Sequence, residues 1–235
     1  MQNTAFRFSL FSVLALLVAG NASAAVVKGK VAFEGTPPVM TKIKMDSDPQ
    51  CALQHPEGHA SEEVIVNPNG TLKNVFVYVK EGLSGQKFTA PKTPVVFDQK
   101  GCRYEPRVFG IQAGQPLQIV NSDPTLHNVH GLPAKSQQFN LGMPIQGMKL
   151  TKSFSAPEVM VKIKCEVHSW MVAYAGVLDH PFYSVSGADG EFQIKDLPPG
   201  TYVIEAWHEK YGAQTQSVTV GAADDMKEAA FAFKG

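Results

Sequence analysis

The sequence predicts an all-β fold. Short runs of residues alternate between apolar and polar side chains with a period of two, which turns one face of each run toward a core. Glycine, proline and asparagine residues separate these runs at the positions of turns. No segment of convincing length carries the helical period before residues 222–232, where we expect a turn followed by an edge strand.

Residues 1–24 have the features of a secretory signal peptide. Arg7 precedes an apolar run from Leu10 to Ala19, and small residues follow that run up to position 24. The run is short for a membrane span, and no later segment has the length of a transmembrane helix. We therefore expect an exported chain with no membrane span, located in a periplasm, or outside a cell that has no outer membrane.

Charge excludes some classes of partner. The chain has 21 basic and 21 acidic residues, and removing Arg7 with the signal leaves this balance almost unchanged. Such a balance provides no strong field for nucleic acid or for an anionic membrane. The residues after the signal are numerous enough for one large β domain or two small ones.

The N-terminal region, residues 25–91, begins with strands and continues into turns. Residues 46–61 are polar and turn-rich, and the Asn69-Gly70 pair is typical of a tight turn between two strands. Residues 81–94 contain several glycines and prolines, which makes them the best candidate for a crossing between domains. The expected strands are Val26–Phe33, Met40–Met45, Val64–Val66 and Leu72–Val79.

The central region, residues 92–181, contains short strands with turns between them. The alternation just before Cys165 puts Val161, Ile163 and the Cys165 thiol on one face, which points the thiol into a core. A long segment rich in methionine and proline, residues 132–149, interrupts the strands. The expected strands are Val95–Asp98, Arg107–Ile111, Leu117–Asn121, Leu150–Phe154, Val159–Cys165 and Ala173–Leu178.

The C-terminal region, residues 182–235, has hairpin character. One turn is expected around Asp189-Gly190 and another around Pro199-Gly200. Alternating apolar pairs on both sides of these turns indicate strands, namely Phe192 and Ile194, Tyr202 and Ile204, and Val218 and Val220.

A set of soft metal ligands lies around the end of the Val159–Cys165 strand. Cys165, His168 and Met171 are spaced three residues apart, so one short loop can present a thiol, an imidazole and a thioether to one ion. A thiolate, two imidazoles and a weak axial thioether form the blue-copper electron-transfer set, and His127 can supply the second imidazole. Met171 could instead be ordinary core packing. The ring edge of His168 would be the natural port for electrons.

Three cysteines allow one disulfide and leave one thiol free. An oxidising compartment favours the bridge, and a metal-binding Cys165 leaves Cys51 and Cys102 to form it. Closing about fifty residues contributes ~4 kcal/mol in the chain-entropy model. The alternative, two separate buried thiols, fits a reducing compartment better.

These ligands resemble those of the cupredoxin family, in particular its amicyanin-type members. The resemblance rests on the C-x2-H-x2-M spacing of Cys165, His168 and Met171 and on the His127-Asn128-Val129-His130 run, and it covers about residues 94–180. It implies a Greek-key β-sandwich with one mononuclear type 1 copper ion. Cupredoxins often have Ser or Thr after the cysteine, bonded to the asparagine beside the first ligand. Glu166 stands there instead, so we expect Asn128, in the second shell, to bond to backbone.

A second resemblance concerns the C-terminal region. Its Asp189-Gly190 turn and its Leu197-Pro198-Pro199-Gly200-Thr201-Tyr202 run are similar to those of carboxypeptidase regulatory-like domains, which are small, non-catalytic, transthyretin-like β-sandwiches. The first strand of that family commonly precedes a glycine-containing turn, as residues 27–35 do here. The resemblance implies that residues 25–91 and 182–235 form one sandwich into which the cupredoxin-like region is inserted.

The sequence gives less reason to expect the other histidines to be metal ligands. His130 lies three residues from His127, and in a strand an odd separation puts the two side chains on opposite faces. Cys51, His55 and His59 have a spacing that could suit a second metal, but we favour a loop pinned by a disulfide, because a proline and a glycine oppose the helix that would align the ligands. For His180 and His208 we expect packing or interface roles.

The predicted function is one-electron transfer. The sequence contains no serine–histidine–aspartate pattern, phosphate loop or paired carboxylates at a recognisable site, so we do not expect an enzyme. The expected partner is a redox protein of unspecified identity. The alternative is a β-sandwich module that carries copper or binds a partner without a redox role, and reversible redox of the bound ion would distinguish the two.

Overall fold

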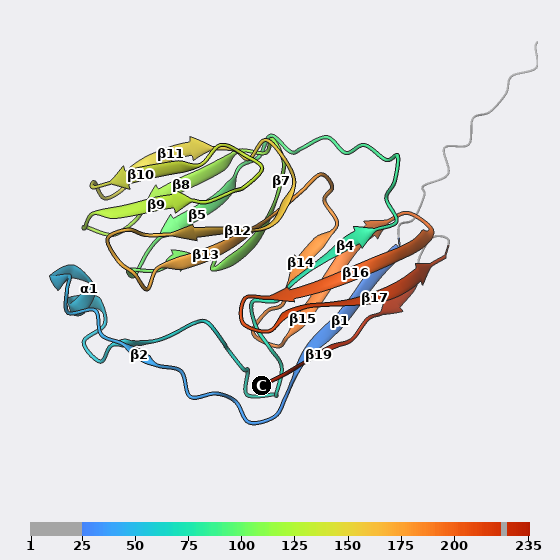
Figure 1. Cartoon of the computed structure of the whole chain (residues 1–235), viewed down its shortest axis with the longest axis horizontal. Coiled ribbons are helices and arrows are strands. Elements are labelled where there is room, and N and C mark those ends of the chain that lie inside the picture. Colours follow the sequence, from blue (N-terminus) through green and yellow to red (C-terminus); the bar gives the residue numbers. More distant parts are fainter. Residues whose placement is uncertain (1–24, 222–224) are drawn as a thin grey trace, which may run out of the picture.

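The computed structural model describes residues 25–221 and 225–235. The predicted signal peptide, residues 1–24, lies outside the described residues. Within them the chain is almost entirely β-structure, with one short helix, which confirms the all-β prediction. None of the helical structure in these residues is long and apolar enough to cross a membrane. The strands form two sandwiches that lie side by side (Figure 1).

One sandwich combines strands from both ends of the described chain, and we call it the terminal sandwich. In its first sheet β1 pairs with β15 on one edge and with β18 and then β19 on the other. Its second sheet has the order β14-β4-β16-β17. The strands are β1 (Ala25–Glu34), β4 (Phe76–Glu81), β14 (Tyr183–Val185), β15 (Glu191–Leu197), β16 (Gly200–His208), β17 (Gly212–Val220), β18 (Met226–Glu228) and β19 (Phe231–Lys234).

Period-two alternation explains the core of the terminal sandwich. In β1 the side chains of Val27 and Val31 are fully buried, and in β15 those of Phe192 and Ile194 meet them from the neighbouring strand. The second sheet closes this core from the other side with residues of β4, β16 and β17 such as Val77. The N-terminal and C-terminal parts of the chain therefore share one hydrophobic core.

The other sandwich is continuous in sequence, and we call it the central sandwich. Its sheets have the orders β10-β9-β12-β13-β7 and β11-β8-β5-β6. The strands are β5 (Val95–Gln99), β6 (Tyr104–Glu105), β7 (Val108–Gln112), β8 (Leu117–Asn121), β9 (His127–Gly131), β10 (Phe139–Met143), β11 (Lys149–Lys152), β12 (Glu158–Lys164) and β13 (Val172–Leu178). Apolar residues of both sheets, including Phe97, Ile119 and Ile163, form its core.

The two sandwiches pack through strands that are buried on both faces. All of β7 is buried, and in β4 the residues that face away from the terminal core meet the central sandwich. Gly110 and Gly176 leave room there for aromatic rings, because a Cβ at these positions would lie 2.1 Å from Tyr183 and 2.2 Å from Phe76. The segment 82–94 connects β4 to β5 without a strand, as a domain crossing would (Figure 1).

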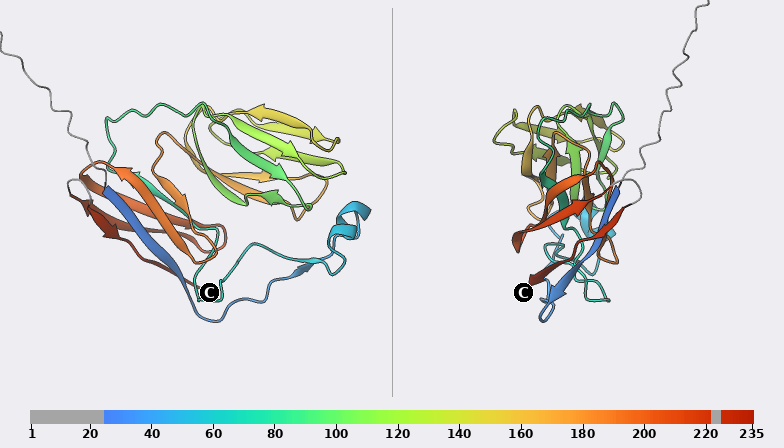
Figure 2. Two further views of the ribbon diagram at one scale, coloured as in Figure 1. Left: turned by 180° about the vertical axis from the view of Figure 1, so that it is seen from behind. Right: turned by 90° about the vertical axis from the view of Figure 1, so that its right-hand side faces the viewer.

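Residues 42–60 leave the terminal sandwich and reach the central one, and we call them the strap. They contain β2 (Lys42–Ile43), helix α1 (Pro49–Gln54) and β3 (His59–Ala60). The left view in Figure 2 places α1 near one end of the central sandwich, and the Cys51–Cys102 disulfide ties it there. The predicted disulfide is thus present. The expected loop contains a short helix that was not predicted, since Asp48 caps α1 and Pro49 begins it, but this helix ends at Gln54 and does not align Cys51, His55 and His59 as metal ligands.

Three expected strands are shortened or reduced to a bridge in the structure. The segments before and after Asn69-Gly70 form a turn with a single bridge between them, Val66 to Leu72. Asn74 adopts a left-handed backbone (φ 63°), and β4 begins only at Phe76. The expected strand Met40–Met45 keeps ladder pairing only over the two residues of β2.

Candidate metal centre

Cys165 lies at the end of β12, where the alternation of that strand places it. Val161, Ile163 and Cys165 are each at most 3% exposed, whereas Lys162 between them is exposed. The thiol is free and points into the core of the central sandwich. Strand β12 pairs with β9 and β13 on its two edges, so the position of the thiol is fixed from both sides.

His127 is the first residue of β9 and is fully buried. His130 lies on the other face of that strand, partly exposed, with its ring nitrogen 2.5 Å from a carboxylate oxygen of Glu166. The structure therefore brings His127, and not His130, to the side of Cys165.

The loop from Cys165 to Met171 is closed by backbone hydrogen bonds. Cys165 N–H donates to Met171 O (3.0 Å), and Met171 N–H donates to His168 O (2.9 Å). His168 N–H donates to the Cys165 sulfur (3.4 Å). These bonds fold His168 back over the thiol, and Met171 is buried in the same core as Cys165.

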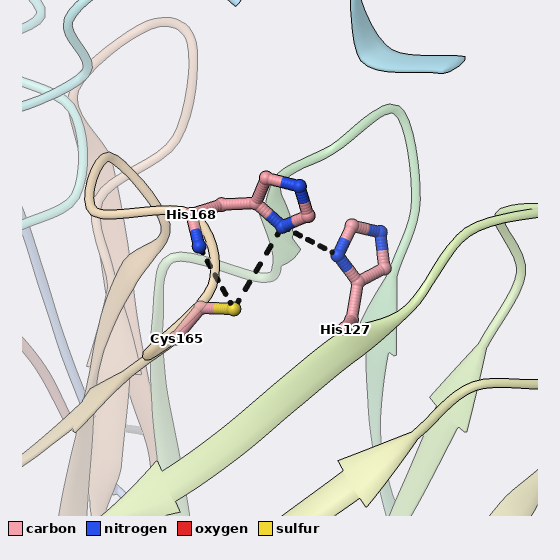
Figure 3. A group of neighbouring side chains, drawn as sticks. All are labelled: His127, Cys165 and His168. Atoms are coloured by element: carbon pink, nitrogen blue, oxygen red, sulfur yellow. Dashed lines mark hydrogen bonds between the residues drawn. The ribbon is translucent and has the colours of Figure 1, made fainter. Parts of the chain in front are cut away.

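Figure 3 shows the two imidazoles and the thiol pointing toward one another. The Nδ1 atoms of His127 and His168 are 3.0 Å apart, and His168 Nδ1 lies 3.8 Å from Cys165 Sγ. One ligand atom from each of the three residues falls within 4.8 Å of the other two, and all three side chains are buried. This spacing allows a single ion to contact all three.

Each imidazole is also held from behind by a carboxylate. Asp123 Oδ2 lies 2.9 Å from His127 Nε2, and Asp48 Oδ2 lies 3.0 Å from His168 Nε2. When each Nε2 carries the proton that it donates to its carboxylate, both Nδ1 atoms are left with free lone pairs. In that protonation state the two lone pairs and the Cys165 sulfur face a common point where a cation can bind, and a carboxylate behind a ligating imidazole is the usual support of a metal site.

The two carboxylates remain ionised at neutral pH. Burial raises the pKa of Asp48, but hydrogen bonds from Thr125, His168 and the first backbone N–H groups of α1 outweigh it and lower the pKa to about 2. Burial likewise opposes ionisation of Asp123, and its bond with His127 and two backbone N–H groups lower its pKa. Both imidazoles therefore face a permanent negative charge.

The thiol is prepared for ionisation. Burial raises the pKa of Cys165, but hydrogen bonding with His127 and His168, together with backbone N–H groups of the loop, brings the pKa down to about 6. The thiolate, which is the form that binds metals, therefore predominates at neutral pH. The donor set consists of a soft anion and two nitrogens, which suits copper.

The bond expected of Asn128 is present. Glu166 N–H donates to Asn128 Oδ1 (3.1 Å), which ties the segment of the first histidine to the segment of the cysteine. Asn128 Nδ2 bonds to Asn140 on the neighbouring strand β10, and Tyr104 donates its hydroxyl to Asn128 O. A backbone N–H replaces the serine or threonine hydroxyl that the family resemblance would suggest.

His168 is not the exposed electron port that we expected. Its side chain is 1% exposed, because the strap covers it. Asp48 bonds to its Nε2, the Cys51 sulfur lies 3.7 Å from the same atom, and the ring of Trp170 packs with its centroid 5.0 Å away. Sequence reasoning missed Asp48 and Asp123, although the Asp48-Pro49 pair has the pattern of a helix N-cap.

The other histidines do not assemble a second site in the part of the chain that the structure describes. Cys51 is in the disulfide, and His55 Nε2 lies 2.8 Å from Gly101 O. His180 bonds to Val79 O, and His208 is buried against aromatic rings. Among the described residues, the groups of ligand atoms close enough to hold an ion draw their histidines from 127 and 168 only.

Several solved structures have a partial likeness to this one. A copper-containing nitrite reductase from Thermus scotoductus SA-01 is 20% identical with a TM-score of 0.35, over 41% of this chain and 25% of that chain. A purple cupredoxin from Nitrosopumilus maritimus is 19% identical with a TM-score of 0.30, over 35% of this chain and 97% of that one. An oxidized mutant of amicyanin is 18% identical with a TM-score of 0.33, over 43% of this chain and 97% of that one.

This chain therefore spans about a quarter of the length of the nitrite reductase that it matches. No protein-family model and no curated protein sequence matches the chain. The function is accordingly argued from the geometry of the metal centre.

Proposed function

We propose that this chain is an exported protein of the cupredoxin type, which holds one mononuclear type 1 copper ion and transfers single electrons. The observation that carries the proposal is the buried meeting point of two imidazole Nδ1 atoms and one thiolate, with each imidazole hydrogen-bonded from behind to an ionised carboxylate. Few roles other than holding a soft cation account for that arrangement.

His127, Cys165 and His168 would hold the ion, and Met171 would be the weak axial ligand. Copper supplies a one-electron couple when bound at such a site. The protein supplies rigidity, since β9, β12 and the closed loop fix the donors, and Asp48 and Asp123 fix the orientation of the two rings. Ligands held in one arrangement rearrange little between oxidation states, which favours fast electron transfer.

The alternative, a protein that carries copper as cargo, is less well supported. His127, Cys165, His168 and Met171 are each at most 3% exposed, and a disulfide-anchored strap covers one side of the site. An ion that must be handed over needs an open path to its ligands. Burial of all four side chains suits a resident ion better.

We also propose the domain organisation and compartment that the sequence predicts. Residues 25–91 and 182–235 would make a carboxypeptidase regulatory-like sandwich with the copper domain, residues 92–181, inserted, and their shared core supports this division. The Cys51–Cys102 disulfide supports an oxidising compartment such as a periplasm.

The test is the visible spectrum of the purified protein with Cu(II). We expect an intense sulfur-to-copper charge-transfer band that Cys165→Ser abolishes and His127→Gln removes or strongly alters. His130→Gln is the matched control, because His130 lies on the other face of β9, and it should keep the band. A colourless complex of the unmodified protein would refute the proposal.

Voltammetry of the same protein tests the redox role. A reversible one-electron wave is expected, and Met171→Leu should keep the colour while raising the reduction potential, because a thioether donates more electron density to Cu(II) than a hydrocarbon does. Coloured protein that gives no reversible wave would favour the alternative without a redox role.

A further inference from the structure

The usual route for electrons out of the proposed copper site is closed in this protein. Asp48 and Cys51 of the strap lie over the Nε2 edge of His168, which leaves that ring 1% exposed. An electron partner therefore cannot touch His168 while the strap is in place. Another residue must connect the site to the surface.

A cavity of about 570 Å³ lies on the side of the ligand loop that carries Trp170 and Met171. The strap bounds it on one side, the central sandwich on another, and Glu209 of the terminal sandwich reaches it from the far end. This volume is within the range of small-molecule sites, so we take a small molecule as the occupant.

Trp170 links this cavity to the metal ligands. The centroids of the Trp170 and His168 rings are 5.0 Å apart. Trp170 Nε1–H donates to Cys102 O (2.9 Å), and this bond holds the indole in place. The indole is partly exposed and lines the cavity. A molecule in the cavity is thus separated from His168 by one aromatic ring, while Met171 also lines the cavity.

The cavity lining has a small excess of positive charge, with four cationic residues against three acidic ones. Its three acidic residues each have a cationic partner, in the pairs Arg103–Glu62 (3.1 Å), Arg107–Glu209 (2.6 Å) and Lys210–Glu63 (3.3 Å). Lys44 and Lys162 also line the cavity, and within residues 25–221 and 225–235 no carboxylate lies in salt-bridge distance of either. Two exposed ammonium groups without partners favour an anion.

We propose that this cavity binds a small anionic one-electron acceptor and that Trp170 is the residue through which the electron reaches it. The inference rests on the proposed function. In the exchange the acceptor gains one electron and the metal centre loses one, no bond forms or breaks, and no proton moves. Lys44 and Lys162 would hold the acceptor, and the strap would keep it away from His168.

The first experiment measures binding without copper. Hexacyanocobaltate(III), a redox-inert trianion, is titrated into the metal-free protein while the indole N–H resonances are followed. The resonance of Trp170 should shift, and that of Trp207, which does not line the cavity, should shift much less. Lys44→Gln combined with Lys162→Gln should weaken binding at least tenfold.

The matched control removes two lysines elsewhere. Lys149 and Lys152 lie on β11, outside the cavity, so replacing both by Gln changes the net charge equally and should leave binding within about twofold. Equal weakening by both pairs, or no shift of the Trp170 resonance, would overturn the proposed anion site. This result does not depend on whether copper binds.

The second experiment measures electron transfer from the reduced copper protein to hexacyanoferrate(III) by stopped flow. Trp170→Leu should slow the reaction at least tenfold when the rates are compared at equal driving force, with the potential of each variant measured separately, and Trp170→Phe should restore most of the rate. Added hexacyanocobaltate(III) should compete with hexacyanoferrate(III) for the cavity and slow its reduction. The same addition should not slow the reduction of a cationic cobalt(III) phenanthroline complex. Equal rates for the Leu and Phe variants and the unmodified protein would refute the role of Trp170.

Discussion

The strap should control access to Cys165, and removing its disulfide tests this directly. The perturbation is the double change Cys51→Ala and Cys102→Ala, which leaves Cys165 as the single thiol in both proteins. The thiol pKa of about 6 means that the reactive thiolate already predominates at pH 7.5. The rate of reaction with a disulfide reagent such as Ellman's reagent, measured over a range of pH in both proteins, therefore separates access to the thiol from its ionisation.

The structure sets the magnitude. The bridge joins residues 51 positions apart, and a cross-link of that length contributes about 4 kcal/mol to the free energy of unfolding in the chain-entropy model. If this whole contribution opposes opening of the strap, removing the disulfide raises the population with an open strap by up to about a thousandfold, since each 1.4 kcal/mol is a factor of ten. We expect the metal-free variant to react at least tenfold faster than the unmodified protein.

The assay needs a stability measurement and a control variant. Urea unfolding of both proteins measures how far global stability falls, and Glu57→Gln serves as a control on the strap, because its ion pair with Lys42 is exposed and long (3.8 Å). Glu57→Gln should leave thiol reactivity unchanged. If the double variant loses stability but reacts no faster with the reagent, Cys165 is reached by another path and the covering role of the strap is wrong.

Two further predictions concern stability measured by urea unfolding. Gly176→Ala should cost roughly 1–3 kcal/mol, because its Cβ would lie 2.2 Å from the Phe76 ring, whereas Gly142→Ala, with nothing within 4 Å, should change little; equal effects would contradict the tight packing between the sandwiches. Burial, helped by the positive charge of Arg107, lowers the pKa of His208 from 6.5 to about 4. The unfolded chain then takes up that proton first, so stability should fall by up to ~3 kcal/mol as pH drops from 6.5 to 4, and His208→Leu should flatten this dependence.

Local patterns were enough to predict much of the fold. Alternation ending at Cys165 identified β12 and the direction of its thiol, since a strand buried on one face repeats every two residues. For the same reason the odd separation of His127 and His130 placed their side chains on opposite faces of β9, and the resemblance to cupredoxins selected His127 as the inward one. Such features depend on neighbours in the chain, and sequence displays them directly.

The features that were missed depend on distant contacts. Helix α1 has six residues, too few to show a period, and Pro56 comes after its end instead of preventing it. Asp48 reaches His168 across 120 positions in the sequence, and no local pattern pairs them. The exposure of His168 was mispredicted because the resemblance concerns the central sandwich alone, whereas the strap that buries this histidine comes from the N-terminal region.

Strand β1 has a consequence for how the molecule can assemble. It pairs with β15 on one edge and with β18 and β19 on the other, and among the described strands no ladder joins those three to one another. The pairing of Ala25 with Leu197 closes most of the chain into a loop, whereas the ladders of the central sandwich close much shorter ones. The central sandwich can therefore form early, and deleting the ten residues of β1 would detach three strands from a sheet that otherwise completes last.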